Sequence, residues 1–499
     1  MISNFLNDDE IIMKKPLNIV QVAPDYYPLP PTNYGGMERI IYNLTEHLVL
    51  KGHNVYLYAP KGSKTSATLI PYEHSGPDQQ KLSEFVMKTL PENVDIIHDH
   101  THSSVIGQIA YAIPTVCTIH CIRKNDVKSP IYLSKRALDI TGEDHGYYVY
   151  NGIDPEEYEY CEKKEDYLLY MGVLNWYKGI LQAIDVAERT RQKLIIAGPI
   201  HDFEYFRNTL EPRINNSNIQ YVGEVGGLRK QELLKKARCL LFPTICEEPF
   251  GLVMIEALAC GTPVLALANG GVEEVLAGFP EMICHSTQEM CKKVLNPNFL
   301  SPKLLRDYVS QHFTTEIMTD NYLMLYKKVL KEDVNLNHGN KLKNQGCFKE
   351  AISYYKNLLI SAVLSVNSKL KICHELADIY SNLGDTDDEL AITFKTFEYD
   401  TPHAEFCCRL GYHFLNNNEL QDAIFWYKLA TQLEKPQHRY EILSEACWTW
   451  LPNIQLCICY YKLGDPLKAF KYNEAARNFL PNDKKILFNK TFLEKILNK

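Results

Sequence analysis

Short apolar runs alternate with amphipathic stretches from Leu17 onward, and this alternation limits the folds open to the chain. Residues 17–23, 54–60, 95–100 and 115–120 are apolar runs of strand length, and residues 37–52 have helical spacing that ends at Gly52. Strands of a parallel sheet are buried on both faces because helices cover both sides. The sequence therefore predicts a doubly wound α/β unit.

A second alternating series follows the turn at Asn151-Gly152. Its predicted strands are residues 167–172, 193–198, 219–223, 238–244 and 263–268. A chain of 499 residues has room for roughly three domains at about 150 residues each. We expect an N-terminal extension over 1–15, Rossmann-like domains over 16–150 and 151–331 with a cleft between them, and a helical domain over 332–499.

The helical C-terminal part carries a repeated spacing. An alanine follows a glycine or asparagine by five positions three times, in the pairs Gly346 with Ala351, Asn418 with Ala423 and Gly464 with Ala469. Small residues at such positions let two paired helices approach closely. This pattern resembles tetratricopeptide repeats, with a further unit at residues 376–385 out of register. An irregular helical bundle is the alternative.

Composition excludes several classes of protein. The net charge is -8 and the pI is near 6.1, so the chain lacks the basic surface that binds a nucleic-acid backbone. Charged and polar residues interrupt every apolar stretch before the roughly 20 residues of a membrane span, and residues 1–15 lack the apolar region of a signal peptide. We expect a cytoplasmic protein, for which peripheral membrane contact stays open, as does the oligomeric state.

Neither a metal nor a disulfide is predicted. The fifteen cysteines are scattered singly or in pairs without two CxxC-type halves, which favours reduced, buried thiols. Asp385 and Asp387 form an Asp-x-Asp sequence in a turn of the repeat region, far along the chain from the donor motifs, and we interpret it as an acid cluster at a helix turn. Cys246 has no evident base nearby and is interpreted as a packing residue.

Residues 239–271 carry the strongest chemical signal. A buried strand runs to Thr244, a short acidic loop follows, and a helix is expected to begin near Phe250 or Gly251 and to end at Gly261. The backbone N–H groups of Phe250, Gly251 and Leu252 are unpaired at such a start and favour a diphosphate through the helix dipole.

Two glutamates flank this helix start. Glu248 lies in the loop, and Glu256 lies eight residues later inside the helix. Glu256 is placed to accept hydrogen bonds from a ribose diol, and Glu248 from hydroxyls of a sugar. The alternative is that the pair only caps the helix, but the strand before it belongs to the type of sheet that binds ligands at the carboxyl ends of its strands.

The motif EEPFGLVMIEALACGTPV (247–264) resembles the E-x7-E signature of retaining family 4 glycosyltransferases. Residues 34–60, 150–158, 168–187 and 193–199 are similar to further motifs of that family, so the resemblance covers about residues 17 to 331. It implies a GT-B fold and transfer of a hexose or N-acetylhexosamine from a nucleotide sugar with uridine as the base, without a metal or other cofactor.

The resemblance also implies roles for single residues. Lys178 matches the lysine that contacts the donor diphosphate, Glu256 the ribose-binding acid, and Glu248 the acid that holds the transferred sugar. The predicted catalytic residues are Glu248, His120 and Lys178. The predicted donor-binding residues are Gly35, Gly36, Lys178, Glu248, Phe250, Gly251, Leu252 and Glu256.

The first domain contributes Gly35, Gly36 and His120 to this comparison. The two glycines match a turn that faces the diphosphate, and His120 matches a histidine near the sugar. Each residue also has a plain interpretation: a simple turn, or a histidine at a strand end with a backbone partner. Their joint order along the chain favours the functional interpretation.

Val173 departs from the family pattern. An arginine usually follows the glycine of that strand and forms, with the lysine at position 178, a cationic clamp on the leaving diphosphate. Losing one preorganised cation can cost about 2–4 kcal/mol of transition-state stabilisation. Either another cation replaces it, or the transfer is slow, or the chain binds donors without turnover and serves as a repeat scaffold.

The acceptor is weakly constrained. The segment between His120 and Ser134 is short for the family, while stacked helix pairs offer a concave surface for extended peptides. Residues 445–465 also resemble repeat domains fused to bacterial glycosyltransferases, some of which modify peptides. We expect a protein or peptide acceptor recruited by the repeats. A surface polysaccharide or glycolipid is the alternative.

Overall fold

A computed structural model describes the chain over residues 16–33, 35–73, 77–109, 113–123, 127–142, 146–360, 364–436 and 443–498. The chain divides into two compact units, Met1–Leu330 and Lys331–Lys499. The predicted extension over 1–15 lies outside the described residues, and the three predicted domain boundaries stay predictions.

The first unit begins with a seven-stranded parallel sheet of order β3-β2-β1-β4-β5-β6-β7. The four predicted strands are confirmed, and three strands were not predicted: the very short β6 and β7, and β3 at the sheet edge. The strands are β1 (Asn18–Val22), β2 (Asn54–Pro60), β3 (Thr68–Tyr72), β4 (Ile96–Asp99), β5 (Thr115–Ile119), β6 (Pro130–Tyr132) and β7 (Tyr147–Tyr148).

Helices cover both faces of this sheet. Ile40 and Leu44 pack on one face and Leu82 and Val86 on the other, in two separate clusters of buried side chains. The helices that carry them are α2 (Gly36–Leu50) and α3 (Gln79–Thr89). Alternate residues of β1 join the two clusters because successive side chains of a strand point to opposite faces.

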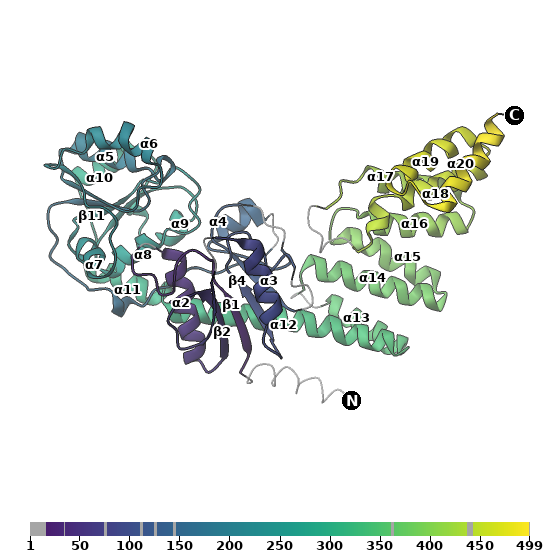
Figure 1. The fold of residues 1–499 in the computed structure, drawn as a ribbon, viewed down its shortest axis with the longest axis horizontal. Coiled ribbons are helices and arrows are strands. Elements are labelled where there is room, and N and C mark those ends of the chain that lie inside the picture. Colours follow the sequence, from purple (N-terminus) through teal and green to yellow (C-terminus); the bar gives the residue numbers. More distant parts are fainter. Residues whose placement is uncertain are drawn as a thin grey trace. The chain divides into compact units, whose positions relative to one another are not determined.

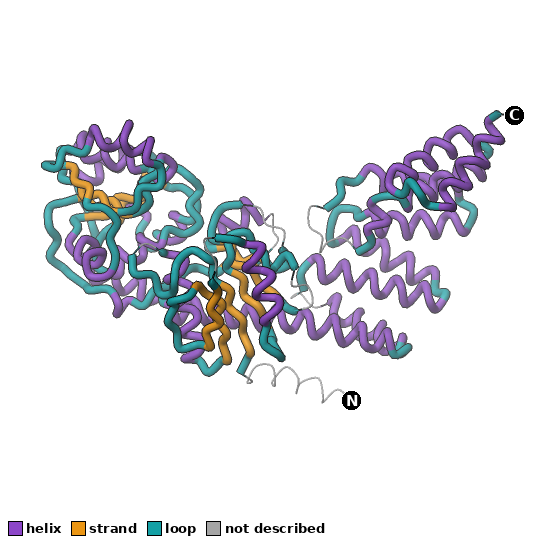
Figure 2. Tube along the Cα trace, viewed as in Figure 1, coloured by secondary structure: helices purple, strands orange, loops and turns teal. Residues whose placement is uncertain are grey.

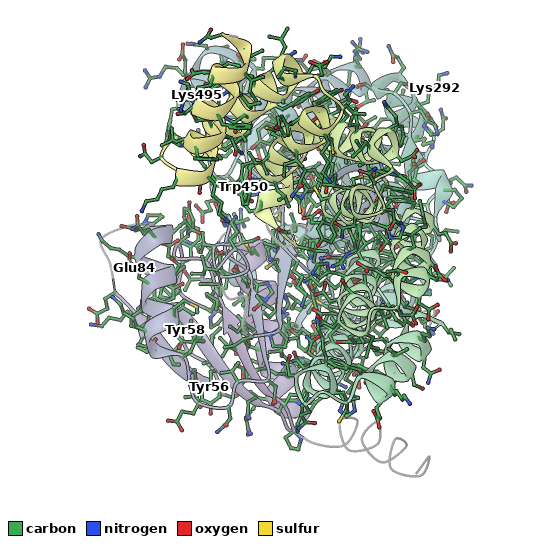
Figure 3. The ribbon with its side chains drawn as sticks, turned by 90° about the vertical axis from the view of Figure 1, so that its right-hand side faces the viewer. Tyr56, Tyr58, Glu84, Lys292, Trp450 and Lys495 are labelled. Atoms are coloured by element: carbon green, nitrogen blue, oxygen red, sulfur yellow. The ribbon has the colours of Figure 1, made fainter. Side chains whose placement is uncertain are left out.

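Tyr56 and Tyr58 of β2 show how a strand and α3 pack together (Figure 3). The two residues are two positions apart and lie on the same face of the sheet. The Tyr58 ring meets Phe85 edge to face at 6.0 Å between centroids, and its hydroxyl donates to the carbonyl of Thr89 at 2.7 Å. The polar end of this buried ring is thereby satisfied.

The second sheet of the first unit has six parallel strands in the order β10-β9-β8-β11-β12-β13. All five predicted strands are confirmed, and only the two-residue β13 was missed. The strands are β8 (Leu168–Met171), β9 (Leu194–Ala197), β10 (Ile219–Tyr221), β11 (Cys239–Phe242), β12 (Val264–Leu267) and β13 (Ile283–Cys284).

Helices again cover both faces of the second sheet (Figure 1). One face carries α5 (Ile180–Thr190) and α10 (Thr287–Leu295). The other face carries α7 (Gly227–Lys236), α8 (Leu252–Ala259) and α11 (Pro302–His312). The two sheet domains form the doubly wound α/β architecture that the alternating pattern predicts.

The chain crosses between the two sheet domains twice. Ile153 forms an isolated parallel bridge with Thr314, so the outgoing and the returning segment lie side by side. After the return, α12 (Thr315–Asn344) starts with Met318, Tyr322 and Tyr326 buried in the core of the first sheet. The sequence analysis assigned these residues to the second domain because they follow its last predicted strand. Helical periodicity does not show that a helix returns to an earlier sheet.

The second unit consists of helices without strands in its described residues (Figure 2). No helix of the described chain is both long and apolar enough to cross a membrane. After α12 the helices are α13 (Phe348–Ile360), α14 (Val366–Leu383), α15 (Thr386–Lys395), α16 (Ala404–Asn416), α17 (Leu420–Gln432), α18 (Leu451–Lys462), α19 (Pro466–Phe479) and α20 (Lys484–Leu497).

The repeated spacing coincides with helix-pair turns. Gly346, Asn418 and Gly464 adopt left-handed conformations between two helices, and the alanines five positions later are fully buried. Gly384 makes a similar turn, but Glu389 occupies the fifth position after it and pairs with Arg409 at 2.8 Å. This unit therefore lacks the buried alanine that follows the other three turns. The helix pairs are observed, while their assignment as tetratricopeptide repeats stays a prediction.

Candidate active site

A cavity of about 580 Å³ lies within the first unit and is lined by both sheet domains. Gly35, Gly36 and Arg39 line it from the first domain, and Glu248 and Glu256 line it from the second. Both glutamates therefore face the space between the domains, as the spacing around the helix start predicts. Lys178 and the start of α8, including Gly251 and Leu252, also line it.

Lys178 and Glu248 form an ion pair in this cavity, with 2.7 Å between Nζ and Oε2. Lys178 ends a short 3₁₀ turn (Trp176–Lys178) after β8, and Gly179 follows with φ 76°. A side chain at Gly179 would bring its Cβ within 1.8 Å of the carbonyl oxygen of Pro243. Glycine at this step therefore allows the lysine loop to pack directly on the loop that follows β11.

A second glycine holds the loop that carries Glu248. Gly270 has φ 64°, and a Cβ there would lie 2.2 Å from backbone atoms of Glu248. The next residue, Gly271, donates its N–H to the carbonyl of Glu248 at 2.7 Å. The turn after β12 therefore packs directly against the backbone of the acidic loop. Only 8% of Glu248 is exposed.

Glu256 accepts hydrogen bonds from two groups that the sequence did not single out. The Lys230 ammonium lies 2.6 Å from Oε1, and the Tyr158 hydroxyl donates to the same atom at 3.0 Å. Burial, with the Glu256 carboxylate beside it, raises the pKa of Tyr158 well above its usual value, so the phenol stays a donor. Glu256 itself is 2% exposed.

The start of α8 presents unpaired backbone amides. In the described structure, the N–H groups of Phe250, Gly251 and Leu252 make no hydrogen bond to the protein. The Phe250 side chain is buried in the core of the second domain, so this residue can offer only its backbone to a ligand. Unpaired amides at a helix start suit an anionic group such as a phosphate.

A second cavity, of about 350 Å³, adjoins the first through the residues that line both. These shared residues are Gly36, Lys178, Glu248, Gly251 and Leu252. The second cavity is lined further by side chains of the first domain, namely Tyr26, Tyr27, Glu38, His102 and His120. The predicted site residues are thus distributed over two connected cavities, with the Lys178–Glu248 pair at their junction.

His120 lies at the end of β5 and lines the second cavity. Its Nε2 lies 3.2 Å from Nδ1 of His100, so its partner is a side chain and not the backbone group of the plain interpretation. Burial, with a smaller contribution from nearby His102, lowers the pKa of His120 to about 3, so the ring is neutral at physiological pH. Glu38 has a raised pKa, chiefly because of burial.

Two family models match the two sheet domains. Residues 34–142 match the model described as Glycosyltransferase Family 4, and residues 159–292 match the model described as Glycosyl transferases group 1. Both models describe glycosyltransferases, and each match falls within one of the two sheet domains. The coarse part of the predicted resemblance is thereby confirmed.

Curated relatives of low identity are also described as glycosyltransferases or mannosyltransferases. An uncharacterized glycosyltransferase of Methanocaldococcus jannaschii is 30% identical over 155 residues, covering 27% of this chain and 40% of the relative. A second one from the same organism is 25% identical over 240 residues, covering 43% and 65%. The chain therefore spans less than two thirds of these relatives. O-antigen chain mannosyltransferase C of Escherichia coli is 21% identical over 379 residues, covering 63% and 99%.

Solved structures share the GT-B fold. AviGT4, a glycosyltransferase involved in avilamycin A biosynthesis, superposes with a TM-score of 0.55 at 25% identity, covering 63% of this chain and 98% of AviGT4. Anabaena Alr3699/HepE, solved with UDP and glucose, superposes with a TM-score of 0.51 at 17% identity, covering 62% and 99%. Both family models end before the helical second unit, which begins at Lys331.

Val173 lines the first cavity, in the place where the family pattern has an arginine. Three cationic side chains line the same cavity: Arg39, Lys178 and Lys230. Arg39 donates to the carbonyl of Pro31 at 2.9 Å, while each lysine pairs with a glutamate. The cavity therefore holds more cations than the predicted lysine alone.

The sequence analysis did not predict three residues of this site, Lys230, Tyr158 and Arg39, for a common reason. Lys230 shares α7 with Lys235 and Lys236, and nothing in the local sequence distinguishes the lysine that reaches Glu256. Tyr158 ends the predicted interdomain motif over 150–158, so its place beside the cleft was the one available signal. Partners across a cleft are set by domain packing, which local patterns do not encode.

No group of three or more His, Cys, Asp or Glu residues in the described chain is arranged to hold a metal ion. The absence of a catalytic metal stays a prediction. Asp385 caps the start of α15 after the turn at Gly384 and accepts a hydrogen bond from the N–H of Asp388, which agrees with an acid cluster at a helix turn. Cys246 lies 3.3 Å from the hydroxyl of Thr244.

Proposed function

We propose that this chain transfers a hexose or N-acetylhexosamine, with retention, from a uridine diphosphate sugar to an acceptor hydroxyl in the cytoplasm. One observation carries the proposal. Two lysine–glutamate pairs, Lys178–Glu248 and Lys230–Glu256, line a single cavity beside the unpaired amides of a helix start. Such a site offers cations and amides to a diphosphate and carboxylates to the hydroxyls on both sides of it.

The donor would lie along the first cavity, with its sugar at the junction with the second cavity. Glu256, held by Tyr158 and Lys230, accepts hydrogen bonds from the ribose diol. The start of α8 and Lys178 bind the diphosphate, while Glu248 holds hydroxyls of the transferred sugar. Hydrogen bonds to charged groups contribute about 1.5–3 kcal/mol each. Gly35 and Gly36 face the diphosphate from the first domain and let its backbone approach closely.

The transfer would take place on one face of the sugar. The bond between the anomeric carbon and the phosphate oxygen breaks, and the acceptor oxygen forms a bond to that carbon from the same side. The acceptor proton passes to the leaving phosphate oxygen, so no protein nucleophile is needed. Lys178 and the amides of α8 stabilise the charge that develops on the diphosphate, and the domains exclude water from the site.

Binding and turnover test this proposal directly. Calorimetry with UDP and mass spectrometry of products from a panel of UDP-sugars, with and without acceptors, measure donor binding and hydrolysis. We expect Glu248→Gln to lose most turnover, and Glu281→Gln, an exposed acid outside both cavities, to retain it. Normal turnover in Glu248→Gln would contradict the role of this residue. A wild-type protein that neither binds UDP nor hydrolyses any donor would instead favour the scaffold alternative.

We infer that the helix pairs of the second unit recruit a protein or peptide acceptor. The support is the series of helix pairs from α12 to α20, because such arrays form extended surfaces for peptides. Removing residues 346–499 leaves α12 whole and should abolish transfer to a protein acceptor while donor hydrolysis persists. Unchanged transfer after this deletion would favour a polysaccharide or glycolipid acceptor.

A further inference from the structure

Three parallel strands of the first sheet bring a polar network to one edge. β1, β4 and β5 are neighbours in the sheet, so their carboxyl ends lie together. They carry Gln21, His98, His100, Thr118 and His120 at or near these ends. All five are buried or half-buried, which makes their hydrogen bonds costly to lose.

A continuous chain of hydrogen bonds links His120 to helix α12. His120 Nε2 lies 3.2 Å from His100 Nδ1, and His100 Nε2 lies 2.8 Å from Gln21 Oε1. Gln21 Nε2 donates to the hydroxyl of Tyr326 at 3.1 Å. The same hydroxyl lies 2.5 Å from Nδ1 of His98. We call the set His120, His100, Gln21, Tyr326 and His98 the histidine relay.

The amide of Gln21 sets the direction of the histidine relay. Its nitrogen donates to Tyr326, so its oxygen is left to accept the proton of His100 Nε2. A neutral imidazole carries one proton, so His100 Nδ1 is an acceptor and His120 Nε2 must be the donor between the two rings. Neutral His120 then has a bare Nδ1, and in the described structure this atom has no hydrogen-bond partner.

Gln21 and His100 do not line either cavity, whereas His120 lines the second one beside Glu248 and Lys178. Gln21 and His100 are also fully buried. They can therefore affect a bound molecule only through His120. A second-layer partner that fixes the tautomer of a histidine determines whether its outer nitrogen accepts or donates.

We propose that Gln21 and His100 are positioning residues that hold His120 as a hydrogen-bond acceptor for a hydroxyl of the bound sugar, so that the site selects neutral sugars over hexuronic acids. The inference rests on the proposed glycosyltransferase function. A hydroxyl can donate to the bare Nδ1, whereas a carboxylate has no proton to donate at neutral pH.

The charged groups around His120 also favour a sugar hydroxyl over a sugar carboxylate. Glu38 and Glu248 line the second cavity, and Lys178 is the one lysine or arginine among its described lining residues. That lysine already pairs with Glu248 at 2.7 Å. A sugar carboxylate in this cavity would face two acidic side chains and a nitrogen lone pair, which repel it. A sugar hydroxyl would find acceptors on each of them.

The tautomer itself can be measured in the wild-type protein. Nitrogen-15 spectra of histidine-labelled protein distinguish a protonated from a bare ring nitrogen, and the His120 signals are identified by their loss in His120→Gln. We expect a bare Nδ1 and a protonated Nε2 at pH 7. A proton on Nδ1 of His120 would overturn the proposal, and this measurement does not depend on turnover.

Two variants at position 21 test the consequence for catalysis. Gln21→Met removes the acceptor at similar size, and Gln21→Glu retains an acceptor oxygen for His100. We expect Gln21→Met to lower kcat at least tenfold with UDP affinity within twofold of wild type, and Gln21→Glu to keep most of kcat. The preference for UDP-glucose over UDP-glucuronic acid should also fall at least tenfold in Gln21→Met.

The outcomes separate this inference from the proposed function. A wild type that binds UDP and turns over, with an unchanged kcat and sugar preference in a folded Gln21→Met variant, would overturn the histidine relay alone. Absence of UDP binding and turnover in the wild type would overturn both. If Gln21→Met does not fold, Gln21→Glu and the wild-type spectra still decide between the two tautomers.

Discussion

The Nζ atom of Lys178 lies 2.7 Å from Oε2 of Glu248, although 70 positions separate the two residues in the chain. The lysine follows β8 and the glutamate follows β11, and these two strands are neighbours at the centre of the second sheet. The pair therefore lies where the strand order reverses, which is where open α/β sheets bind ligands.

Replacing Lys178 should weaken diphosphate binding. In Lys178→Gln the cation is lost while a polar side chain remains. One charge-assisted contact contributes about 1.5–3 kcal/mol, so UDP affinity should fall roughly ten- to a hundredfold. Calorimetric titration with UDP measures the effect, and Lys193→Gln, an exposed lysine outside both cavities, is the matched control. Equal affinities in the two variants would exclude Lys178 from the diphosphate site.

Replacing Lys230 should affect both stability and binding. Lys230→Met leaves the Glu256 carboxylate buried with only the Tyr158 hydroxyl as partner, and we expect a loss of about 1–3 kcal/mol in the free energy of unfolding. Urea unfolding measures this loss. The double variant Lys230→Met/Glu256→Gln should recover part of it because the unpaired charge is gone. A double variant as unstable as the sum of its parts would argue against the pair.

Val173→Arg should raise turnover. It restores a cation where the family pattern has one, and such a cation can contribute about 2–4 kcal/mol to transition-state stabilisation. We therefore expect donor hydrolysis to accelerate at least tenfold. Val173→Met controls for the added length without charge. An unchanged rate in Val173→Arg would indicate that Arg39 or Lys230 already supplies the second cation.

The buried histidines should make stability fall in mild acid. Burial lowers the pKa of His120 to about 3 and lowers the pKa of His98 and His100 well below 6.5. The unfolded chain takes up these protons below pH 6.5 while the folded protein does not. Their contribution is therefore complete above pH 6.5 and is lost as the pH falls below it, by about 1.4 kcal/mol per pH unit for each histidine.

Urea midpoints between pH 7.5 and 5 measure this dependence. In His98→Gln, the slope between pH 6.5 and 5 should decrease by about one proton relative to wild type. His285→Gln, at an exposed position, is the matched control. If both variants keep the wild-type slope, His98 does not remain neutral in the folded protein.

Ala423 should tolerate no larger side chain. It is fully buried where α16 meets α17, so Ala423→Leu is expected to cost about 1–3 kcal/mol through overpacking. Thermal unfolding of the full chain measures the effect, and Gln421→Leu, at an exposed position of the same helix, is the control. UDP binding by the first unit should be unaffected. An equal loss of stability in both variants would argue against close packing at Ala423.

Much of the fold and part of the site were predictable from the sequence. Strand and helix patterns act over five to fifteen residues, so the long strands and the start of α8 followed from local spacing. Glu248 and Glu256 were found for the same reason, since one loop and one helix carry both. The repeated turns at Gly346, Asn418 and Gly464 are local as well.

Only the tertiary structure decided which side chains meet. The return of α12 to the first sheet, the choice of Lys230 among the lysines of α7, and the histidine relay from Tyr326 to His120 all join residues far apart in sequence. Local periodicity specifies that a strand is buried but not which strand lies beside it. The sequence by itself therefore determined the elements and the motif at the helix start, whereas strand order and domain packing determined the partners that fix charge and protonation in the site.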